Sequence, residues 1–160
     1  MVCILIVLHP CTKNDEQKAA AIIERQEAID QRLETYRKQF VNRVFYMDSY
    51  HCIILSAPDD KGKGVGTLMD GMLTFYDFRY NIDIENLDED EINCEYTVDG
   101  RKFTLEVFDK HLYYSAQGQV ESFNSEKNEE LYKSFTERVA KINKGEKVYG
   151  NPTVSVTPVE

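Results

Sequence analysis

The first apolar segment of the chain is continuous rather than periodic. Residues 2–8 read VCILIVL and are rich in β-branched side chains. An unbroken apolar run of this length is typical of a strand that is covered on both faces of a sheet. We therefore expect residues 2–8 to form a central strand.

A helical period follows this run. The chain has no Gly or Pro between residues 12 and 43, and Thr12 or Asn14 can cap a helix that starts there. Apolar side chains then recur at helical spacing, at Ile22, Ile29, Leu33, Tyr36 and Phe40. This pattern predicts one long amphipathic helix.

The next forty residues predict strands on either side of a glycine-rich loop. Two short strand-like runs lie within residues 44–56 and meet at Asp48-Ser49. The segment APDDKGKGVGT, residues 57–67, is dense in turn-forming residues, so we expect a loop there. From residue 72 to 84 apolar side chains occupy the even positions, which predicts a long half-buried strand.

The clearest local pattern is INCEYTVDGRKFTLEVF, which predicts a hairpin over residues 91–108. A two-residue Asp99-Gly100 turn would pair Cys94 with Leu105 and would place apolar side chains on one face throughout. A further turn at Asp109-Lys110 would bring residues 112–116 back to the same apolar face.

A second helix is expected after these strands. Ser125 is a suitable N-cap, and Gly145 is suited to follow the last turn. The apolar stripe of this helix comprises Leu131, Tyr132, Phe135, Val139 and Ile142. Residues 146–160 contain two prolines and little apolar surface to bury, so we expect a poorly ordered C-terminal tail.

The order of these elements predicts an α+β fold. A chain of this length commonly forms one domain, which we place at residues 1–145, with the tail at 146–160. We expect a largely antiparallel sheet of about five to six strands. The long N-terminal helix and the C-terminal helix would pack on one face of it, because each has one apolar stripe to bury.

Composition points to a cytoplasmic protein. The longest apolar run, residues 1–8, is shorter than the ~20 residues that cross a bilayer. It also lacks the basic segment and the small-residue cleavage site of a signal peptide. The four cysteines are scattered singly, which favours reduced thiols, and Cys3 and Cys52 lie in apolar runs that are typical of a core.

The negative charge is concentrated in one segment of the chain. The net charge is −9, and residues 80–100 contain eight acids and no Lys or Arg. Such a segment produces a field that attracts a basic partner and repels phosphate groups, so we expect no direct nucleic-acid binding. The candidate partner-binding residues are Asp83, Glu85, Asp88, Glu89, Asp90, Glu91 and Glu95.

Cys11 stands where the apolar run meets the predicted helix, a position that can activate a thiol. Its segment CTKNDEQ would resemble the CX5R loop of phosphatases only if residue 17 were Arg, and it is Gln17. A CxxC motif would need a second cysteine at residue 14, where the chain has Asn14. We therefore predict that Cys11 is not catalytic.

No other motif carries a defined chemistry. A Walker loop requires a Lys directly before its Ser or Thr, and the run from Gly62 to Thr67 has no Lys at that position. Lys61 and Lys63 nevertheless leave an anion site open as an alternative. The histidines and cysteines lack metal-ligand spacing. We therefore expect no catalytic residue, no metal and no cofactor.

These features favour a non-enzymatic acidic protein that engages a basic surface of another protein, as inhibitors, immunity proteins and anti-defence proteins do. The alternative is a small-molecule binder, because the order of elements is loosely similar to the helix-grip layout. In that case a cavity between sheet and helices would be lined by Tyr76, Tyr80, Tyr96 and Tyr114.

Overall fold

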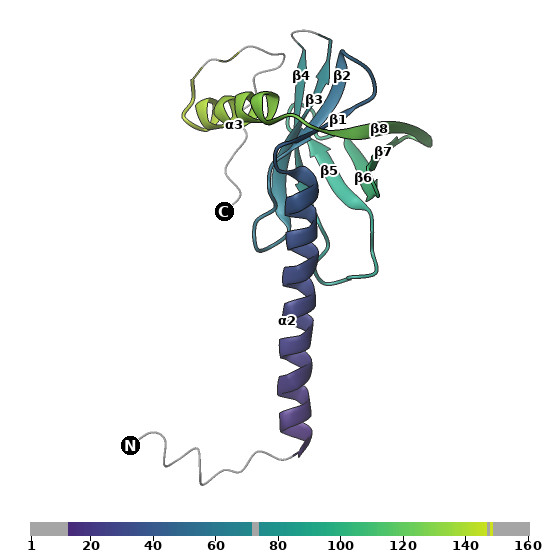
Figure 1. Ribbon diagram of the computed structural model, residues 1–160, viewed down its shortest axis with the longest axis vertical. Coiled ribbons are helices and arrows are strands. Elements are labelled where there is room, and N and C mark those ends of the chain that lie inside the picture. The colour runs from purple at the N-terminus through teal and green to yellow at the C-terminus, as the bar shows by residue number, and fades with distance from the viewer. Residues whose placement is uncertain (1–12, 72–73, 147, 149–160) are drawn as a thin grey trace.

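A computed structural model describes residues 13–71, 74–146 and 148, and a closed β-barrel is its main body (Figure 1). Each strand pairs antiparallel with the next, and the last strand pairs with the first. The strands are β1 (Arg43–Tyr46), β2 (His51–Leu55), β3 (Lys63–Asp70), β4 (Phe75–Asn81), β5 (Ile92–Tyr96), β6 (Lys102–Phe108), β7 (His111–Ala116) and β8 (Gln119–Lys127). Helix α2 (Lys13–Phe40) precedes the barrel and helix α3 (Glu129–Asn143) follows it.

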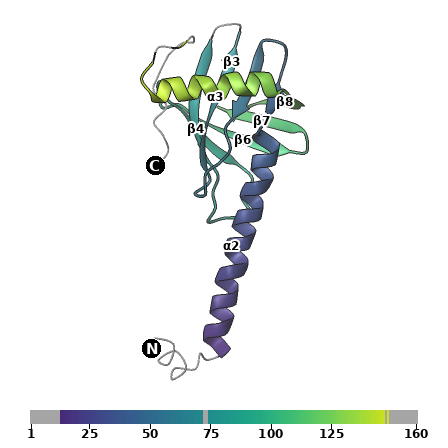
Figure 2. The same cartoon turned by 60° about the vertical axis from the view of Figure 1, so that its left-hand side comes forward.

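This architecture corrects the expected α+β fold. We predicted an open sheet of about five to six strands with both helices on one face. The sheet instead closes into an eight-stranded antiparallel barrel, and the protein is mostly β. Helix α2 extends from one end of the barrel, whereas α3 lies across its outer wall (Figure 2). Closure pairs Phe45 of β1 with Ser125 of β8, which leaves no unpaired sheet edge.

The barrel interior contains the larger of two hydrophobic cores. An eight-stranded barrel is just wide enough for side chains to fill, and here aromatic rings occupy much of the space. The rings of Phe78 and Phe103 lie 5.1 Å apart, and those of Phe103 and Tyr114 lie 4.7 Å apart. The fully buried interior side chains include Phe45, Ile53, Leu55, Phe78, Ile92, Leu105, Leu112 and Phe123.

Helix α2 confirms the long helix predicted between residues 12 and 43. Its last turns are buried against one end of the barrel interior through Ile29, Leu33, Tyr36 and Phe40. The Phe40 ring packs edge-on against Tyr80, with 5.8 Å between ring centroids. The apolar stripe of α2 therefore closes this end of the barrel.

Helix α3 forms the second core on the outside of the barrel. Its Tyr132, Phe135 and Ile142 pack over outward-facing side chains of β1, β2 and β3. The helix was predicted correctly but begins later than expected, because Asn128 and not Ser125 is the N-cap. The Asn128 side chain accepts a hydrogen bond from the Leu131 N–H at 3.0 Å.

The last five residues of the glycine-rich segment, 63–67, belong to strand β3, where we expected a loop. Gly64 and Gly66 lie directly opposite Tyr80 and Phe78 of β4. A Cβ atom on Gly64 would lie 2.3 Å from the Tyr80 ring, and one on Gly66 would lie 2.4 Å from the Phe78 ring. Glycine is needed at both positions because the two rings fill the space that a side chain would occupy.

The β5–β6 hairpin is confirmed, but its turn and register differ from the prediction. Cys94 pairs with Phe103, and a four-residue loop, 97–100, replaces the two-residue turn. Thr97 donates from its backbone N–H and its hydroxyl to the Asp77 carbonyl of β4, which takes it out of the hairpin. The register moves by two residues, so the predicted apolar face is retained.

The remaining strand predictions have mixed outcomes. The two runs within residues 44–56 form β1 and β2, and the turn at Asp109-Lys110 leads into β7 as expected. Strand β4 occupies part of the predicted range 72–84, and β8 was not predicted. The proposed strand at residues 2–8 and most of the 146–160 tail lie outside the described residues.

Candidate functional site

The acidic loop, which we define as residues 82–91, connects β4 to β5 at the barrel end that α2 closes. Six of the seven acids singled out from the sequence lie in this loop. The seventh, Glu95, lies on β5, where its neighbours across the sheet are Arg79 and Lys102. Chain topology thus separates Glu95 from the rest of the predicted set and places it between basic residues.

The acidic loop is attached to α2 mainly through its backbone. The Arg32 guanidinium donates to the carbonyl oxygens of Leu87 and Glu89, and its side chain is 18% exposed. Leu87 and Ile84 are partly buried against the barrel core. The loop therefore keeps its position through carbonyl groups and apolar contacts, and most of its carboxylates are not needed for this purpose.

Two carboxylates of the loop form ion pairs with α2. The Arg25 guanidinium lies 2.9 Å from the Glu85 carboxylate, and Arg32 lies 3.6 Å from Asp90. The Glu85 and Asp90 side chains are 83% and 72% exposed. Ion pairs as open to solvent as these contribute about 0–1 kcal/mol each.

The other acids of the loop are exposed (Asp88 and Glu91) or half-buried (Asp83 and Glu89). Asp83 shapes the turn by accepting hydrogen bonds from the N–H groups of Glu85 and Asn86 at 2.9 and 3.1 Å. Within the described part of the chain, Asp88, Glu89 and Glu91 form no ion pair with a basic side chain. The loop consequently retains a negative surface beside α2.

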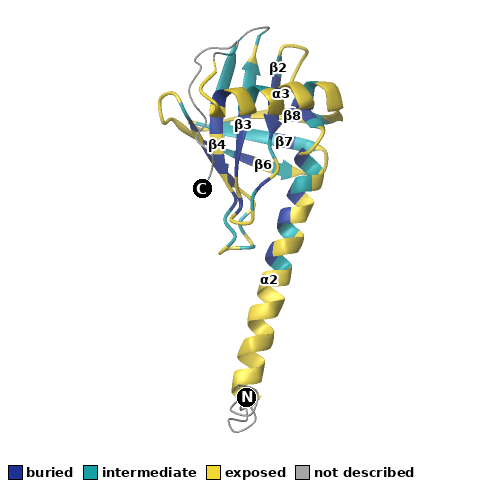
Figure 3. Cartoon of the chain, turned by 90° about the vertical axis from the view of Figure 1, so that its left-hand side faces the viewer, coloured by how far each residue is buried: buried dark blue, intermediate teal, exposed yellow. Residues whose placement is uncertain are grey.

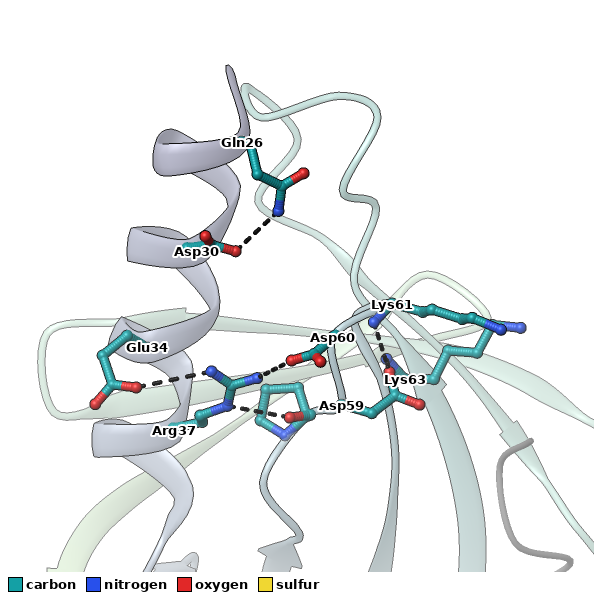
Figure 4. A network of polar contacts seen from close by, with 9 residues as sticks. Gln26, Asp30, Glu34, Arg37, Asp59, Asp60, Lys61 and Lys63 are labelled. Carbon is teal, nitrogen blue, oxygen red and sulfur yellow. Dashed lines mark hydrogen bonds and ion pairs between the residues drawn. The ribbon is translucent and has the colours of Figure 1, made fainter. Parts of the chain in front are cut away.

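A second loop holds α2 from another direction (Figure 4). Arg37 donates from Nε to the Pro58 carbonyl and from Nη2 to the Asp60 carboxylate, each at 3.2 Å. Asp59 stabilises this loop by accepting from the backbone N–H groups of Lys61 and Lys63, both at 2.9 Å. Because Asp59 occupies these N–H groups, they do not offer the anion site that the glycine run left open.

Sequence reasoning missed the three arginines that fix α2. Arg25, Arg32 and Arg37 flank the buried stripe of the helix, and the first two are seven residues apart. That spacing was a visible signal of one helix face, but their partners lie in loops that are distant along the chain. Only the folded chain brings these loops to the helix.

The first half of α2 forms a helical arm, defined here as residues 13–27. Every residue of the arm is exposed, and the arm extends away from the barrel (Figure 3). Ile22 and Ile23 are 70% and 59% exposed. Isolated helices of this length are marginal in water, and the arm presents both isoleucines to solvent.

The remaining candidate groups are structural where they are described. Cys52 and Cys94 are buried free thiols, and burial raises the pKa of Cys52 to about 11 and also raises the pKa of Cys94. Cys3 and Cys11 lie outside the described residues. The same described ranges contain no cluster of His, Cys, Asp and Glu arranged to hold a metal ion.

The tyrosines considered as cavity-lining residues face the barrel interior. Tyr80 is buried and donates from its hydroxyl to the Ser56 carbonyl at 2.8 Å. The hydroxyls of Tyr96 and Tyr114 lie 2.9 Å apart, and both residues border a cavity of about 220 Å³ at the barrel end opposite α2. The helix-grip layout is not observed, because the sheet closes on itself and α2 caps its end.

Comparison with known proteins adds no assignment. No family model matches the chain, and neither the curated proteins nor the solved structures include a significant match. Among the described residues, none of the helices combines the length and apolar character that crossing a membrane requires.

Proposed function

We propose that this protein is a non-enzymatic binding protein whose acidic loop and helical arm together hold a basic protein partner. The observation that carries the proposal is the attachment of the acidic loop to α2 through Arg32 and two backbone carbonyls. This arrangement leaves carboxylates exposed on a loop whose position is fixed. A partner would meet a preformed negative surface rather than a mobile one.

Electrostatics determines which partner fits this surface. Within the described residues the carboxylates of Asp88, Glu89 and Glu91 form no ion pair, and Glu85 can exchange its exposed Arg25 for a cation of the partner. A basic surface would be drawn to these acids at a rate that falls as salt screens the charges. The free thiols of Cys52 and Cys94 suit a reducing compartment such as the cytoplasm.

The helical arm would supply the apolar part of the contact. Ile22 lies one helical turn before Arg25, which holds Glu85 of the acidic loop, so apolar and acidic groups adjoin. A partner that covers both isoleucines would also order the arm. We therefore expect a basic partner surface with an apolar patch at its centre or edge.

The experiment compares two triple variants of equal charge. The variant D88N/E89Q/E91Q removes three acids of the loop that form no ion pair within the described residues, and E126Q/E130Q/E137Q removes three exposed acids from β8 and α3. The probe is a synthetic deca-lysine peptide at low salt, followed by NMR shifts of the backbone amides. We expect shifts centred on residues 85–91 and several-fold weaker binding for the loop variant alone.

A native partner is then isolated by crosslinking in extracts of the source cells and identified by mass spectrometry. The proposal requires that this partner present a basic surface and that its association rate fall in the loop variant. Equal association rates for both triple variants, or crosslinks that avoid both the loop and the arm, would overturn it.

A second candidate function is small-molecule binding at the opposite end of the barrel. The cavity of about 220 Å³ there is bordered by the paired Tyr96 and Tyr114 hydroxyls and by Arg101. Such a site would suit a small polar ligand. A small molecule that copurifies with the protein, and is lost in the Tyr114→Phe variant, would favour this function over protein binding.

A further inference from the structure

A second cavity, of about 250 Å³, lies between the last turns of α2 and the rim of the barrel. Three basic side chains line it: Lys38 from α2, Arg43 from the start of β1, and Lys110 from the β6–β7 turn. They come from three separate elements. No part of the acidic loop lines the cavity, so it is distinct from the proposed partner surface.

The strand pairing explains why these groups converge. Ser125 of β8 lies directly opposite Phe45 of β1, and its N–H donates to the Lys110 carbonyl at 2.8 Å. Strand β8 therefore joins the beginning of β1 to the β6–β7 turn. The end of α2 packs over this junction, which brings Lys38 to the same cavity.

These three cations are not neutralised within the described part of the chain. Neither Lys38, Arg43 nor Lys110 forms an ion pair there, although the protein as a whole carries a net charge of −9. By contrast, Arg37 on the same helix reaches both Glu34 and Asp60. Arg37 is therefore ion-paired, whereas the three basic groups at the cavity are not ion-paired within the described residues.

One acid belongs to the cavity and reduces its charge without cancelling it. Asp109 lines the wall from the β6–β7 turn, where its backbone has φ of 57°. Three basic groups against one acid leave an excess of positive charge. Like charges held together repel one another, and a bound anion would relieve that repulsion.

We propose that this cavity binds the phosphate group of a small organic molecule. The Arg43 guanidinium can donate two parallel hydrogen bonds to phosphate oxygens, and Lys38 and Lys110 add point charges. The Ser125 hydroxyl and the Gln39 amide line the same wall and can donate further hydrogen bonds.

The cavity also has room for more than phosphate. Phe45 and Val107 contribute apolar wall, which phosphate alone would not contact. The volume lies just below the roughly 300–1,000 Å³ of sites for drug-sized ligands, so a compact phosphomonoester fits it better than a nucleotide. The site would make the protein responsive to a phosphorylated metabolite independently of its protein partner.

The test titrates inorganic phosphate and phenyl phosphate into the full-length protein and follows backbone amides by NMR. Sodium chloride at matched ionic strength is the reference. We expect saturable shifts at Lys38, Arg43, Lys110 and Ser125, with phenyl phosphate binding more tightly than phosphate. Unsaturable shifts, or equal shifts with chloride, would overturn the site, and equal affinities would overturn the assignment to an organic phosphate.

Two substitutions at equal charge make the test specific. Lys110→Gln lies in an exposed turn and should leave the fold unchanged, whereas Lys61→Gln removes a charge from a different loop. Loss of one charge-assisted contact should weaken phenyl phosphate binding about tenfold in Lys110→Gln and leave it unchanged in Lys61→Gln. Equal weakening in both variants would show attraction by overall charge alone and would overturn the proposal.

Discussion

Arg138 of α3 donates to the carboxylate of Asp77 on β4 at 2.5 Å, and the two side chains are 10% and 1% exposed. Asp77 occupies an odd position of a strand whose odd positions we expected to face solvent. Helix α3 covers it instead, and the Arg138 guanidinium also lies 4.7 Å from the centre of the Phe75 ring. The helix thus brings the cation that makes this buried carboxylate tolerable.

Removing this cation should destabilise the fold strongly. In Arg138→Met the Asp77 carboxylate stays buried without its partner, and we expect a loss of about 3–5 kcal/mol in the free energy of unfolding. Urea denaturation measures it. The control Arg25→Met breaks an exposed ion pair and should cost less than about 1 kcal/mol. A similar small loss for both variants would contradict the prediction.

Filling the space at Gly66 should also be costly. A Cβ atom there would lie 2.4 Å from the Phe78 ring and 2.9 Å from the Ile54 carbonyl oxygen. The backbone atom cannot move aside easily, so we expect Gly66→Ala to lose about 1–3 kcal/mol or more. Thermal denaturation of Gly66→Ala, Phe78→Leu and the double variant tests this prediction. If the two substitutions were simply additive, the ring would not be the cause.

His51 should make stability depend on pH. Hydrogen bonds and charge from Asp48, with a contribution from Asp70, raise the pKa of His51 above its usual 6.5. The folded state therefore holds this proton more tightly than the unfolded state does. Its stabilising contribution is complete below about pH 6.5 and is lost as pH rises through the raised folded pKa.

NMR titration of the His51 ring measures this pKa directly. Asp48→Asn keeps an oxygen that can accept from the Tyr50 and His51 N–H groups but removes the charge. We expect the pKa of His51 to fall in this variant and the pH dependence of stability to weaken. An unchanged titration curve would show that Asp48 is not the cause.

Hydrogen exchange should divide α2 into two parts. The described part of the chain holds the helical arm through the exposed Arg25–Glu85 contact, which protects no backbone amide, so amides of the arm should exchange close to the rate of a fraying helix. Amides of residues 29–40, which close the barrel, should exchange only when the core opens. Slow exchange throughout residues 13–27 of the isolated protein would mean that the arm is already covered, for example in a dimer.

The amphipathic helices and the alternating faces of the strands could be predicted because they depend on neighbouring residues. The stripe of α2 and the apolar face of the β5–β6 hairpin both follow from spacing along the chain. Even where the hairpin register was wrong by two residues, the side chains that remained in β5 and β6 kept their expected faces. A shift of two residues is invisible to a pattern whose period is two.

The acidic loop shows the same division at the candidate site. Its charge could be read directly, but its attachment could not, because Arg32 meets carbonyl groups more than fifty residues away along the chain. Backbone carbonyls are present at every position and give no sequence signal. The sequence therefore identified the negative segment, and tertiary contacts decided which of its acids pair with α2 and which remain open to solvent.

Barrel closure and the identity of β3 were decided by tertiary structure alone. Strands β1 and β8 pair residues about eighty positions apart, such as Phe45 and Ser125, and no local pattern records that pairing. In β3 the glycines that resembled a loop are strand residues, because the rings of Phe78 and Tyr80 occupy the space above them. Local spacing determines on which face of a helix or strand a residue lies, whereas packing against distant side chains determines what that face contacts.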